Sequence, residues 1–320
     1  MLESIAGSID VCAALVSSCS KIFKLKYKLK KQELMCSSIL GSNGMAQSRI
    51  IVNDDYEHPD NIEYILESVL MPSEDSLDFI QLKNEYNSLI LHQCQCDKGD
   101  CSRCSHGGAY EYCPKGKELI QRQSKESCSI PILECNSLCD CRLDFCTNRL
   151  VQYGPRENLE VFNSATFKSK GVRTKVNIPC GAFICEYAGE ILTISEAKRR
   201  LVNNKELECM NYVLVLNEYT KTDDCREEKR QVTIVDPSRR GNIGRYINHS
   251  CEPNCQIAAV RIDCPIPKIC IFAARNIHAH EELCFHYGGE DQQVDQASDS
   301  KTCLCTADSC AGFMPNSAII

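Results

Sequence analysis

The chain has 320 residues, of which 43% are apolar, and a formal net charge of -7. This length is enough for one large domain or two modest domains with a buried core. The acidic balance argues against a protein that binds nucleic acid through a broadly basic surface, and no sequence-specific nucleic-acid contact is expected. No stretch reaches the roughly 18 apolar residues of a membrane span, so no membrane association is expected.

Cysteine is the outlier of the composition, with 25 residues in the chain. A secretory signal places its basic residues before an apolar run, whereas the apolar residues 4–20 contain Asp10 and are followed by basic residues. The thiols are therefore expected to be reduced, and clustered reduced thiols favour zinc over disulfides or buried free thiols.

The first 92 residues carry no recognisable chemistry. Residues 1–46 are interpreted as an extension without stable structure, although their basic run at 21–31 could instead serve as a nuclear-import signal or contact an acidic surface. Residues 47–92 are interpreted as an N-terminal segment. A short helix is predicted there from the apolar spacing of Ile62, Ile65, Leu66, Val69 and Leu70.

Residues 93–150 contain two dense cysteine groups, CxCx4CxxC and CxxxCxCx4C, joined by a looser stretch. Thiolates at this spacing can share one metal or bridge adjacent metals. Three tetrahedral zinc ions need about twelve ligand positions, which about nine thiolates fill if three of them bridge. The expected ligands in the two groups are Cys94, Cys96, Cys101, Cys104, Cys135, Cys139, Cys141 and Cys146.

From Leu159 onward, short apolar runs separated by turn residues predict a β-rich domain. Residues 182–192 read as a strand that enters a turn at Gly189, and residues 210–216 read as a further strand. Thr193 and Glu196 form a capping box, which predicts that a helix begins there. The charged residues 218–230 are interpreted as a surface loop.

Two separated segments carry the strongest functional signal: RYINHSCEPN at 245–254 and EELCFHYGG at 281–289. Together they resemble the paired signature of the SET-domain protein lysine methyltransferases. The run ECNSLCDCRLDFCTNRLVQ at 134–152 resembles the pre-SET zinc cluster of the suppressor-of-variegation class. The resemblance covers about two thirds of the chain and is closest to SETMAR-type and suppressor-of-variegation-type histone methyltransferases.

The resemblance implies a mainly β fold with short helices, in which small curved sheets and a threaded pseudoknot form the SET domain. Its implied segments are a pre-SET zinc cluster at 93–150, the SET domain at 151–289, a linker at 290–301 and a zinc-bound post-SET segment at 302–318. By resemblance the ninth pre-SET thiolate is Cys113, with Cys128 in reserve, although a cluster with fewer zinc ions stays open. The post-SET zinc ligands are Cys251, Cys303, Cys305 and Cys310.

The resemblance also implies the active-site roles. Ser169-Lys170-Gly171 occupies the place of a family Gly-x-Gly, with Ser169 replacing the first glycine. Tyr287 is expected to be catalytic, and Phe285 to leave room for more than one methyl group. Tyr187 and Tyr212 complete the lysine channel. The implied S-adenosylmethionine contacts are Ser169, Lys170, Gly171, Tyr212, Arg245, Asn248 and His249.

The expected function is that of a nuclear, chromatin-associated methyltransferase that uses S-adenosylmethionine and zinc. Its expected partner is the histone H3 tail, with the lysine at position nine converted to di- or trimethyl-lysine. One alternative is a catalytically weak, zinc-bound chromatin scaffold, suggested by the replaced glycine and the thinned cysteine set. Another is methylation of a different H3 lysine or of a non-histone protein.

Overall fold

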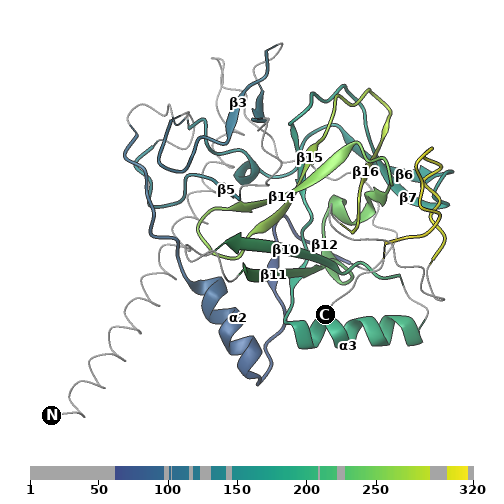
Figure 1. The fold of residues 1–320 in the computed structure, drawn as a ribbon, viewed down its shortest axis with the longest axis horizontal. Helices are drawn as coiled ribbons and strands as arrows, with labels where there is room; N and C mark the ends of the chain where they lie inside the picture. The colour runs from purple at the N-terminus through teal and green to yellow at the C-terminus, as the bar shows by residue number, and fades with distance from the viewer. Residues whose placement is uncertain are drawn as a thin grey trace.

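The computed structural model describes residues 62–96, 101, 103–114, 118–122, 131–141, 146–207, 210–221, 228–288 and 301–315. These residues form small sheets, with two α-helices along one side (Figure 1). The mainly β fold with short helices is therefore confirmed. The predictions for residues 1–46 and for Cys128, and for nearly all of the linker, lie outside the described residues.

One four-stranded sheet carries the two signature segments. Its order begins with two strands that are neighbours in space although more than thirty residues apart in the chain, and it ends with an antiparallel hairpin. The strands, in sheet order, are β13 (Asn248–His249), β16 (Glu282–Phe285), β7 (Ser169–Thr174) and β6 (Leu159–Ser164).

A second four-stranded sheet joins the cysteine-rich segment to the rest of the molecule. The strands, in sheet order, are β5 (Ile132–Leu133), β14 (Cys255–Arg261), β15 (Lys268–Ala273) and β8 (Phe183–Glu186). Its strands β15 and β8 are largely apolar and buried, as suits strands covered on both faces. Because β5 pairs with β14, the cysteine segment is fixed to this sheet by backbone hydrogen bonds.

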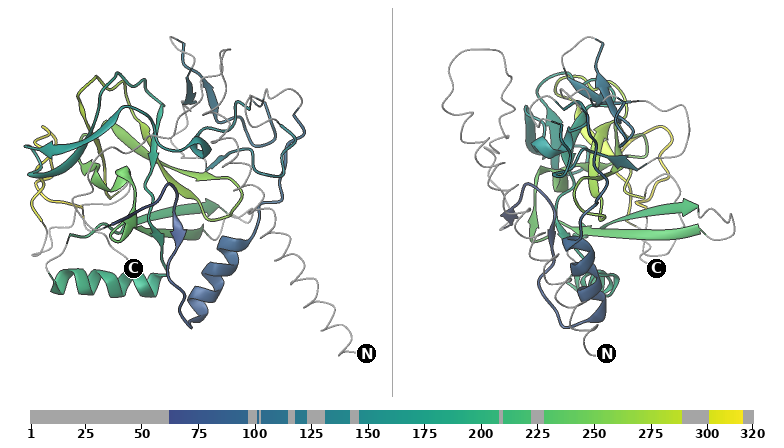
Figure 2. Two further views of the ribbon diagram at one scale, coloured as in Figure 1. Left: turned by 180° about the vertical axis from the view of Figure 1, so that it is seen from behind. Right: turned by 90° about the vertical axis from the view of Figure 1, so that its left-hand side faces the viewer.

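The third four-stranded sheet consists of β10 (Leu214–Lys221), β11 (Glu228–Asp236), β9 (Glu190–Ile191) and β2 (Val69–Leu70). The β10–β11 hairpin projects from the body (Figure 2, right). Its strands extend into residues 218–221 and 228–230, so the prediction of a surface loop over all of 218–230 was wrong at both ends. Two smaller sheets pair β1 (Glu63–Tyr64) with β12 (Arg240–Gly241), and β3 (Tyr110–Tyr112) with β4 (Leu119–Gln121).

The helix predicted within residues 62–70 was wrong. This stretch instead supplies β1 and β2, which pair in parallel with β12 and β9. The apolar spacing fits a helix equally well, but the pairing partners lie more than one hundred residues downstream and decide the outcome. The helix α2 (Leu77–Asn87) follows; Ser76 caps it by accepting a hydrogen bond from Phe79 N at 3.1 Å.

The helix predicted from the capping box is confirmed as α3 (Ile194–Glu206). Thr193 is its N-cap residue, and its Oγ1 accepts from Glu196 N at 3.1 Å. Both helices lie on the side of the molecule that carries β10 and β11 (Figures 1 and 2). The shorter 3-10 helices are η2 (Val151–Tyr153) and η3 (Ile243–Tyr246).

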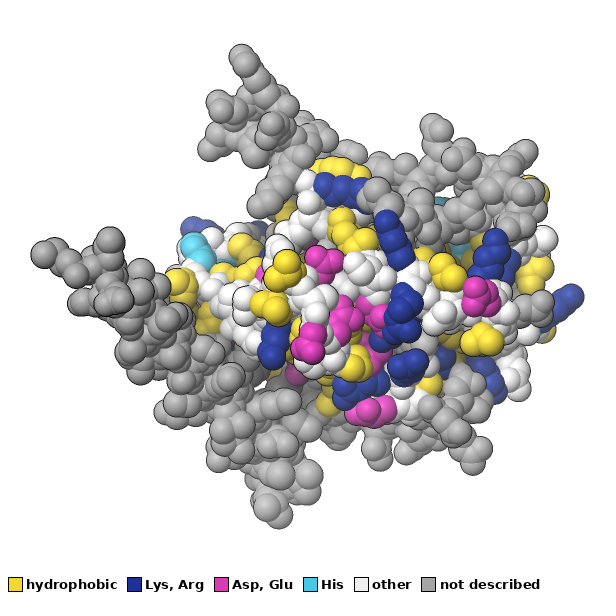
Figure 3. Space-filling model, turned by 90° about the horizontal axis from the view of Figure 1, so that it is seen from below, with side chains coloured by type: hydrophobic (Ala, Val, Ile, Leu, Met, Phe, Trp, Pro, Cys, Tyr) yellow, Lys and Arg dark blue, Asp and Glu magenta, His cyan; other side chains and the backbone are white. Residues whose placement is uncertain are grey.

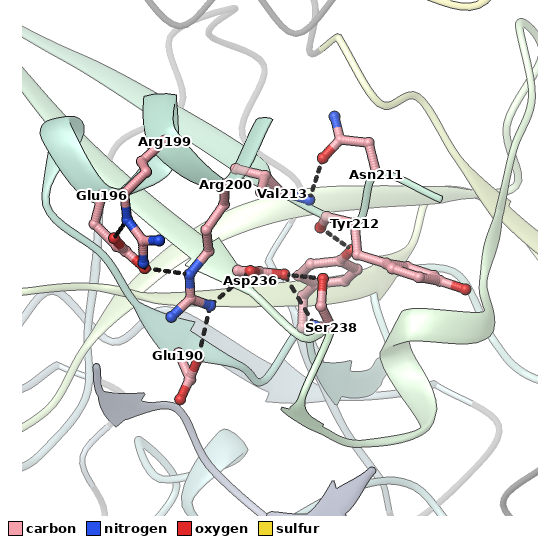
Figure 4. Close-up of polar contacts among 10 residues, drawn as sticks. Glu190, Glu196, Arg199, Arg200, Asn211, Tyr212, Val213, Asp236 and Ser238 are labelled. Atoms are coloured by element: carbon pink, nitrogen blue, oxygen red, sulfur yellow. Dashed lines mark hydrogen bonds and ion pairs between the residues drawn. The ribbon is translucent and has the colours of Figure 1, made fainter. Parts of the chain in front are cut away.

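A buried ionic cluster holds α3 against the third sheet (Figure 4). Arg200 Nη1 donates to Glu190 Oε2 at 2.6 Å on β9 and to Asp236 Oδ2 at 2.7 Å on β11. Its Nε donates to Glu196 Oε1 at 2.7 Å, one helical turn away. The guanidinium therefore links three elements at one point, in a geometry where each charge has partners.

The main hydrophobic core draws residues from all three four-stranded sheets, such as Val172, Leu283, Ile271 and Val235. Seen from the side of the helices, the described surface carries basic and acidic side chains next to one another (Figure 3). Across the described part of the chain, the helices are too short or too polar to cross a bilayer.

Candidate active site and metal centres

The two signature segments lie side by side. β13 pairs in parallel with β16, with Asn248 opposite Cys284 and His249 opposite Phe285. Beyond the strand, Ser250 N donates to Phe285 O at 3.2 Å. This pairing brings the amide and imidazole of one segment next to the aromatic side chains of the other.

Three aromatic rings meet at this junction, and we call Tyr187, Phe285 and Tyr287 the aromatic corner. The Phe285 ring lies 4.9 Å from the Tyr287 ring and 5.9 Å from the Tyr187 ring, measured between centroids. Tyr187 Oη donates to the Tyr212 carbonyl at 2.7 Å, and Tyr287 Oη donates to the Ile247 carbonyl at 2.8 Å. Since each phenol proton is committed to a backbone carbonyl, the phenol oxygens remain available as acceptors.

Both phenols of the aromatic corner stay protonated at neutral pH. Burial raises the pKa of Tyr287 well above its usual value, with smaller contributions from Cys284 and Tyr212. Burial also raises the pKa of Tyr187, and Tyr287 and Asp236 raise it further. The corner is therefore a neutral surface of hydrogen-bond acceptors, not a pair of phenolate bases.

A polar group next to the aromatic corner contains the predicted residues Ser169, Lys170, Gly171 and Asn248. Asn248 Nδ2 donates to Lys170 O and to Glu282 Oε1, each at 3.0 Å. Ser169 Oγ lies 3.4 Å from Asn248 Oδ1. A Cβ added at Gly171 would collide with the Glu282 carboxylate and approach Asn248 Nδ2 at 3.2 Å.

Glu282 was not among the residues predicted for the site. Its side chain, on β16, connects β6 to β13. Oε2 accepts from Ser164 Oγ at 2.7 Å, and Oε1 accepts from Asn248 Nδ2 at 3.0 Å. The available signal was the acidic pair that opens EELCFHYGG.

Arg245 and His249 have different neighbours at this junction. The Arg245 guanidinium lies 4.2 Å above the Tyr212 ring and 4.9 Å from the Tyr246 ring. Tyr287 N donates to His249 Nδ1 at 3.2 Å, and His249 Nε2 lies 3.6 Å from Cys251 Sγ. Burial, aided by His286, lowers the pKa of His249 to about 4, so the ring is neutral. His249 thus links the backbone of Tyr287 to the C-terminal cysteines.

Eight cysteines gather in what we call the cysteine core: Cys94, Cys96, Cys101, Cys104, Cys135, Cys139, Cys141 and Cys146. The Sγ–Sγ distance is 3.7 Å for Cys94 and Cys135, and 3.6 Å for Cys141 and Cys146. A disulfide would need about 2.0 Å. The edge of a zinc tetrahedron with bonds of about 2.3 Å is about 3.8 Å, so the spacing fits shared zinc ions.

Hydrogen-bond donors around the cysteine core also suit thiolates. Asn148 Nδ2 points at Cys104 Sγ and Cys135 Sγ, at 3.8 and 3.7 Å. Arg149 is 2% exposed, and its Nη2 donates to Cys141 Sγ at 3.6 Å. A buried cation needs compensating negative charge, which metal-bound thiolates supply.

Cys113 is not brought to the cysteine core. It follows β3, its N–H donates to Glu118 O at 2.8 Å, and its side chain packs against the main hydrophobic core. The metal-compatible groups of the described residues instead include His106, together with Cys94, Cys104 and Cys135. Sequence reasoning missed His106, although Cys104-Ser105-His106 has the spacing of a Cys-x-Cys pair.

The C-terminal cysteines come together as predicted. The metal-binding atoms of Cys251, Cys303, Cys305 and Cys310 all lie within 4.8 Å of one another. Cys251 Sγ is 4.0 Å from Cys303 Sγ and 3.9 Å from Cys310 Sγ, near the edge of a zinc tetrahedron of about 3.8 Å. A hydrogen bond of 3.0 Å from Ser309 N to Glu252 Oε1 also holds this segment to the first signature.

Comparison with known proteins agrees with this geometry. Residues 169–288 match the model of the SET domain family. The bovine (Bos taurus) histone-lysine N-methyltransferase SETMAR is 36% identical over 271 residues, which cover 80% of this chain and 82% of that protein.

Two solved structures are similar to the fold. The methyltransferase domain of human SETMAR aligns with a TM-score of 0.64 and 33% identity, covering 81% of this chain and 91% of that one. KRYPTONITE, solved with methylated DNA, an H3(1-15) peptide and SAH, aligns with a TM-score of 0.55 and 26% identity, covering 79% and 48%. The chain therefore belongs to the SET-domain histone-lysine N-methyltransferases.

Proposed function

We propose that this protein methylates the histone H3 tail at the lysine in position nine, in the nucleus and on chromatin, and yields di- or trimethyl-lysine. The observation that carries the proposal is the aromatic corner, where two phenols with committed protons lie next to the Phe285 ring. Such a surface can hold a neutral amine by its N–H groups and leave its lone pair free to react.

S-adenosylmethionine, when bound, supplies an electrophilic methyl group on a positively charged sulfur. The residues that would hold it are Lys170, Gly171, Tyr212, Arg245 and Asn248. The side chains of Asn248, Lys170 and Tyr212 are partly exposed, while Phe285 beside them is 1% exposed. This combination of accessible polar groups and a buried apolar wall fits a ligand with a charged amino-acid end and a less polar reacting end.

The chain must also favour the neutral form of the substrate lysine. A lysine with its reference pKa of about 10.4 costs about 4 to 5 kcal/mol to deprotonate at pH 7. The rings of the aromatic corner, two buried and Tyr287 partly buried, disfavour an ammonium by desolvation, which supplies part of that cost. The neutral phenols then orient the amine, and the proton leaves to water before the new N–C bond forms.

The choice of histone H3 is supported by two observations. KRYPTONITE, with which this chain shares its fold, was solved with an H3(1-15) peptide and SAH. The net charge of -7 also suits a basic tail as substrate. Position nine is the commonest target in the suppressor-of-variegation class that the pre-SET run resembles.

We further propose three zinc ions in the cysteine core and one at the post-SET cysteines. The eight thiolates of the core leave one terminal position to fill if three tetrahedra share three bridging sulfurs. With that position filled by a protein ligand, both sites are closed, so their role is to stabilise the fold and not to activate water.

The test is radiolabelled methyl transfer to H3 tail peptides, with matched peptides in which only the lysine at position nine is replaced by arginine. Wild-type protein should label the first peptide and not the second.

Tyr287→Phe should lose most activity, whereas Tyr219→Phe, whose ring is 55% exposed on β10, should behave as wild type. Equal labelling of both peptides would overturn the position. If no peptide is labelled and calorimetry detects no saturable binding of S-adenosylmethionine, the protein is a scaffold.

A further inference from the structure

We propose that His106 is a metal ligand of this protein and supplies, through its imidazole Nδ1, the one non-cysteine position of the pre-SET zinc cluster. The inference rests on the proposed zinc cluster and identifies its ninth ligand, in place of Cys113.

The position of His106 supports coordination. Its side chain is 6% exposed, and it belongs to a buried group with Cys94, Cys104 and Cys135 whose ligand atoms all lie within 4.8 Å. His106 Nδ1 is 3.7 Å from Cys104 Sγ. In a tetrahedron with Zn–S of about 2.3 Å and Zn–N of about 2.0 Å, that edge would be about 3.5 Å.

The other ring nitrogen supplies a second, independent observation. His106 Nε2 lies 3.3 Å from the His92 carbonyl oxygen, which can only accept a hydrogen bond. Nε2 therefore carries the proton, and the lone pair of a neutral ring is on Nδ1, toward Cys104. Metal-binding histidines are commonly held this way, with the second nitrogen bonded to a backbone carbonyl. Nε2 also lies 3.9 Å from Cys139 Sγ, a longer contact.

The local backbone explains how residues 104 and 106 can face the same metal. Gly107 N donates to Cys104 O at 2.9 Å, which closes a tight turn around His106. Gly107 has φ +97°, a conformation that favours glycine, and Gly108 has φ +57°. The chain then leaves toward β3, which carries Cys113 away to the main hydrophobic core.

A neutral imidazole does not bridge two zinc ions, so His106 must be a terminal ligand and the three bridging ligands must be cysteines. The twelve coordination positions are then filled by about eight thiolates and one imidazole. The cluster carries one negative charge fewer than a set of nine thiolates would give, which leaves the buried Arg149 to balance a smaller excess.

The test uses the full chain, with its zinc replaced by an NMR-active cadmium isotope and its histidines labelled with nitrogen-15. One cadmium resonance should show a scalar coupling to a histidine Nδ1, and His106→Cys should abolish that coupling while keeping about four metal ions per chain. His106→Ala should hold less metal than wild type. Two control variants should keep both the metal count and the coupling. His92→Ala removes an exposed ring but keeps the His92 carbonyl that contacts His106, and Cys113→Ser removes the thiol outside the cysteine core.

Two results would overturn the proposal, and they differ in what they show. If about four metal ions bind, no histidine coupling is lost in His106→Cys, and Cys113→Ser loses metal, then Cys113 is the ninth ligand and the zinc cluster itself stands. If wild-type protein holds only about one metal ion, the pre-SET cluster is absent and its histidine ligand with it.

Discussion

At the scale of single residues, the space beside the substrate amine depends on Phe285. Its ring is 1% exposed and lies within 5.9 Å of the Tyr187 ring and 4.9 Å of the Tyr287 ring. Phe285→Tyr would add a hydroxyl, and a water bound to it, to a corner already bounded by two phenols. We expect the product to shift from di- or trimethyl-lysine toward monomethyl-lysine, as measured by mass spectrometry of the H3 peptide.

The control for that shift is Phe183→Tyr, which adds the same hydroxyl in a different hydrophobic cluster, next to Phe272. It should lower stability without changing the product distribution. An unchanged distribution in Phe285→Tyr would show that this ring does not limit the number of methyl groups.

The raised pKa values of the two phenols predict the pH dependence of activity. Because burial raises the pKa of both Tyr187 and Tyr287, both stay protonated up to and beyond pH 10. Activity should therefore rise with pH as the substrate amine, with a reference pKa of about 10.4, loses its proton.

Tyr287→Phe should lower kcat by about a hundredfold, equivalent to about 2.7 kcal/mol.

The shape of the pH profile distinguishes orientation from base catalysis. If Tyr287 only orients the amine, the Tyr287→Phe profile should keep the wild-type shape at a lower level. If the rise in activity at high pH disappears in Tyr287→Phe, the phenolate takes part in the reaction.

The sequence was enough to predict that the two signature segments belong together, and the structure pairs them next to Tyr187. It did not reveal Glu282 or His106, because their contacts are established only when the chain folds around them. The role of Glu282 is visible only in the folded chain, where Ser164 and Asn248 both donate to its carboxylate. His106 requires the loop of Cys104 and the carbonyl of His92 to come together.

At the scale of elements, Gly171 on β7 leaves the space that the Glu282 carboxylate of β16 and the Asn248 amide of β13 occupy. Gly171→Ala should displace Glu282 and Asn248, and we expect a loss of about 1 to 3 kcal/mol of stability together with weaker S-adenosylmethionine binding by calorimetry. The matched change Ser169→Gly restores the usual family residue at an exposed position. It should change affinity little, and equal effects of the two variants would contradict this account.

The attachment of α3 to the third sheet depends on Arg200. Its side chain is 9% exposed and pairs with three carboxylates, so Arg200→Met leaves buried negative charges without their cation. We expect a loss of about 3 to 5 kcal/mol, seen as a lower midpoint in thermal or urea unfolding.

The neighbouring Arg199 provides a matched comparison within the same helix. It pairs with Glu196 at 2.6 Å, but its side chain is 62% exposed. Arg199→Met should therefore cost no more than about 1 kcal/mol. Similar losses for the two variants would show that burial of the Arg200 cluster contributes little to stability.

Elements were predictable where the signal is local. The capping box of α3 lies within four residues, and the helix begins where it predicts. The segment 62–70 was mispredicted because its two short strands form only by pairing with β12 and β9. Periodicity in a single stretch does not contain that information.

At the scale of the whole molecule, the two metal centres should differ in how easily they lose zinc. Three of the four post-SET cysteines are partly exposed, whereas most of the cysteine core is buried. Mild chelation should therefore remove about one zinc and abolish activity with little change in Tm. Strong chelation should remove the remainder and unfold the chain, because structural zinc contributes directly to folding free energy.

Zinc release and circular dichroism, followed during a chelator titration, would check this order. A single step in which all metal, activity and folded structure disappear together would contradict it.

The pairing of β2 with β9 also bears on how the chain can be shortened. Ser68 N donates to Glu186 Oε1 at 2.8 Å, and Lys268 Nζ bonds both Glu67 and Glu186, at 3.2 and 2.7 Å. Trimming back to Cys94 would remove β1 and β2 from the edges of their sheets and leave the Lys268–Glu186 pair more exposed to solvent. A recombinant catalytic fragment should therefore start before residue 62, well ahead of the zinc-binding segment.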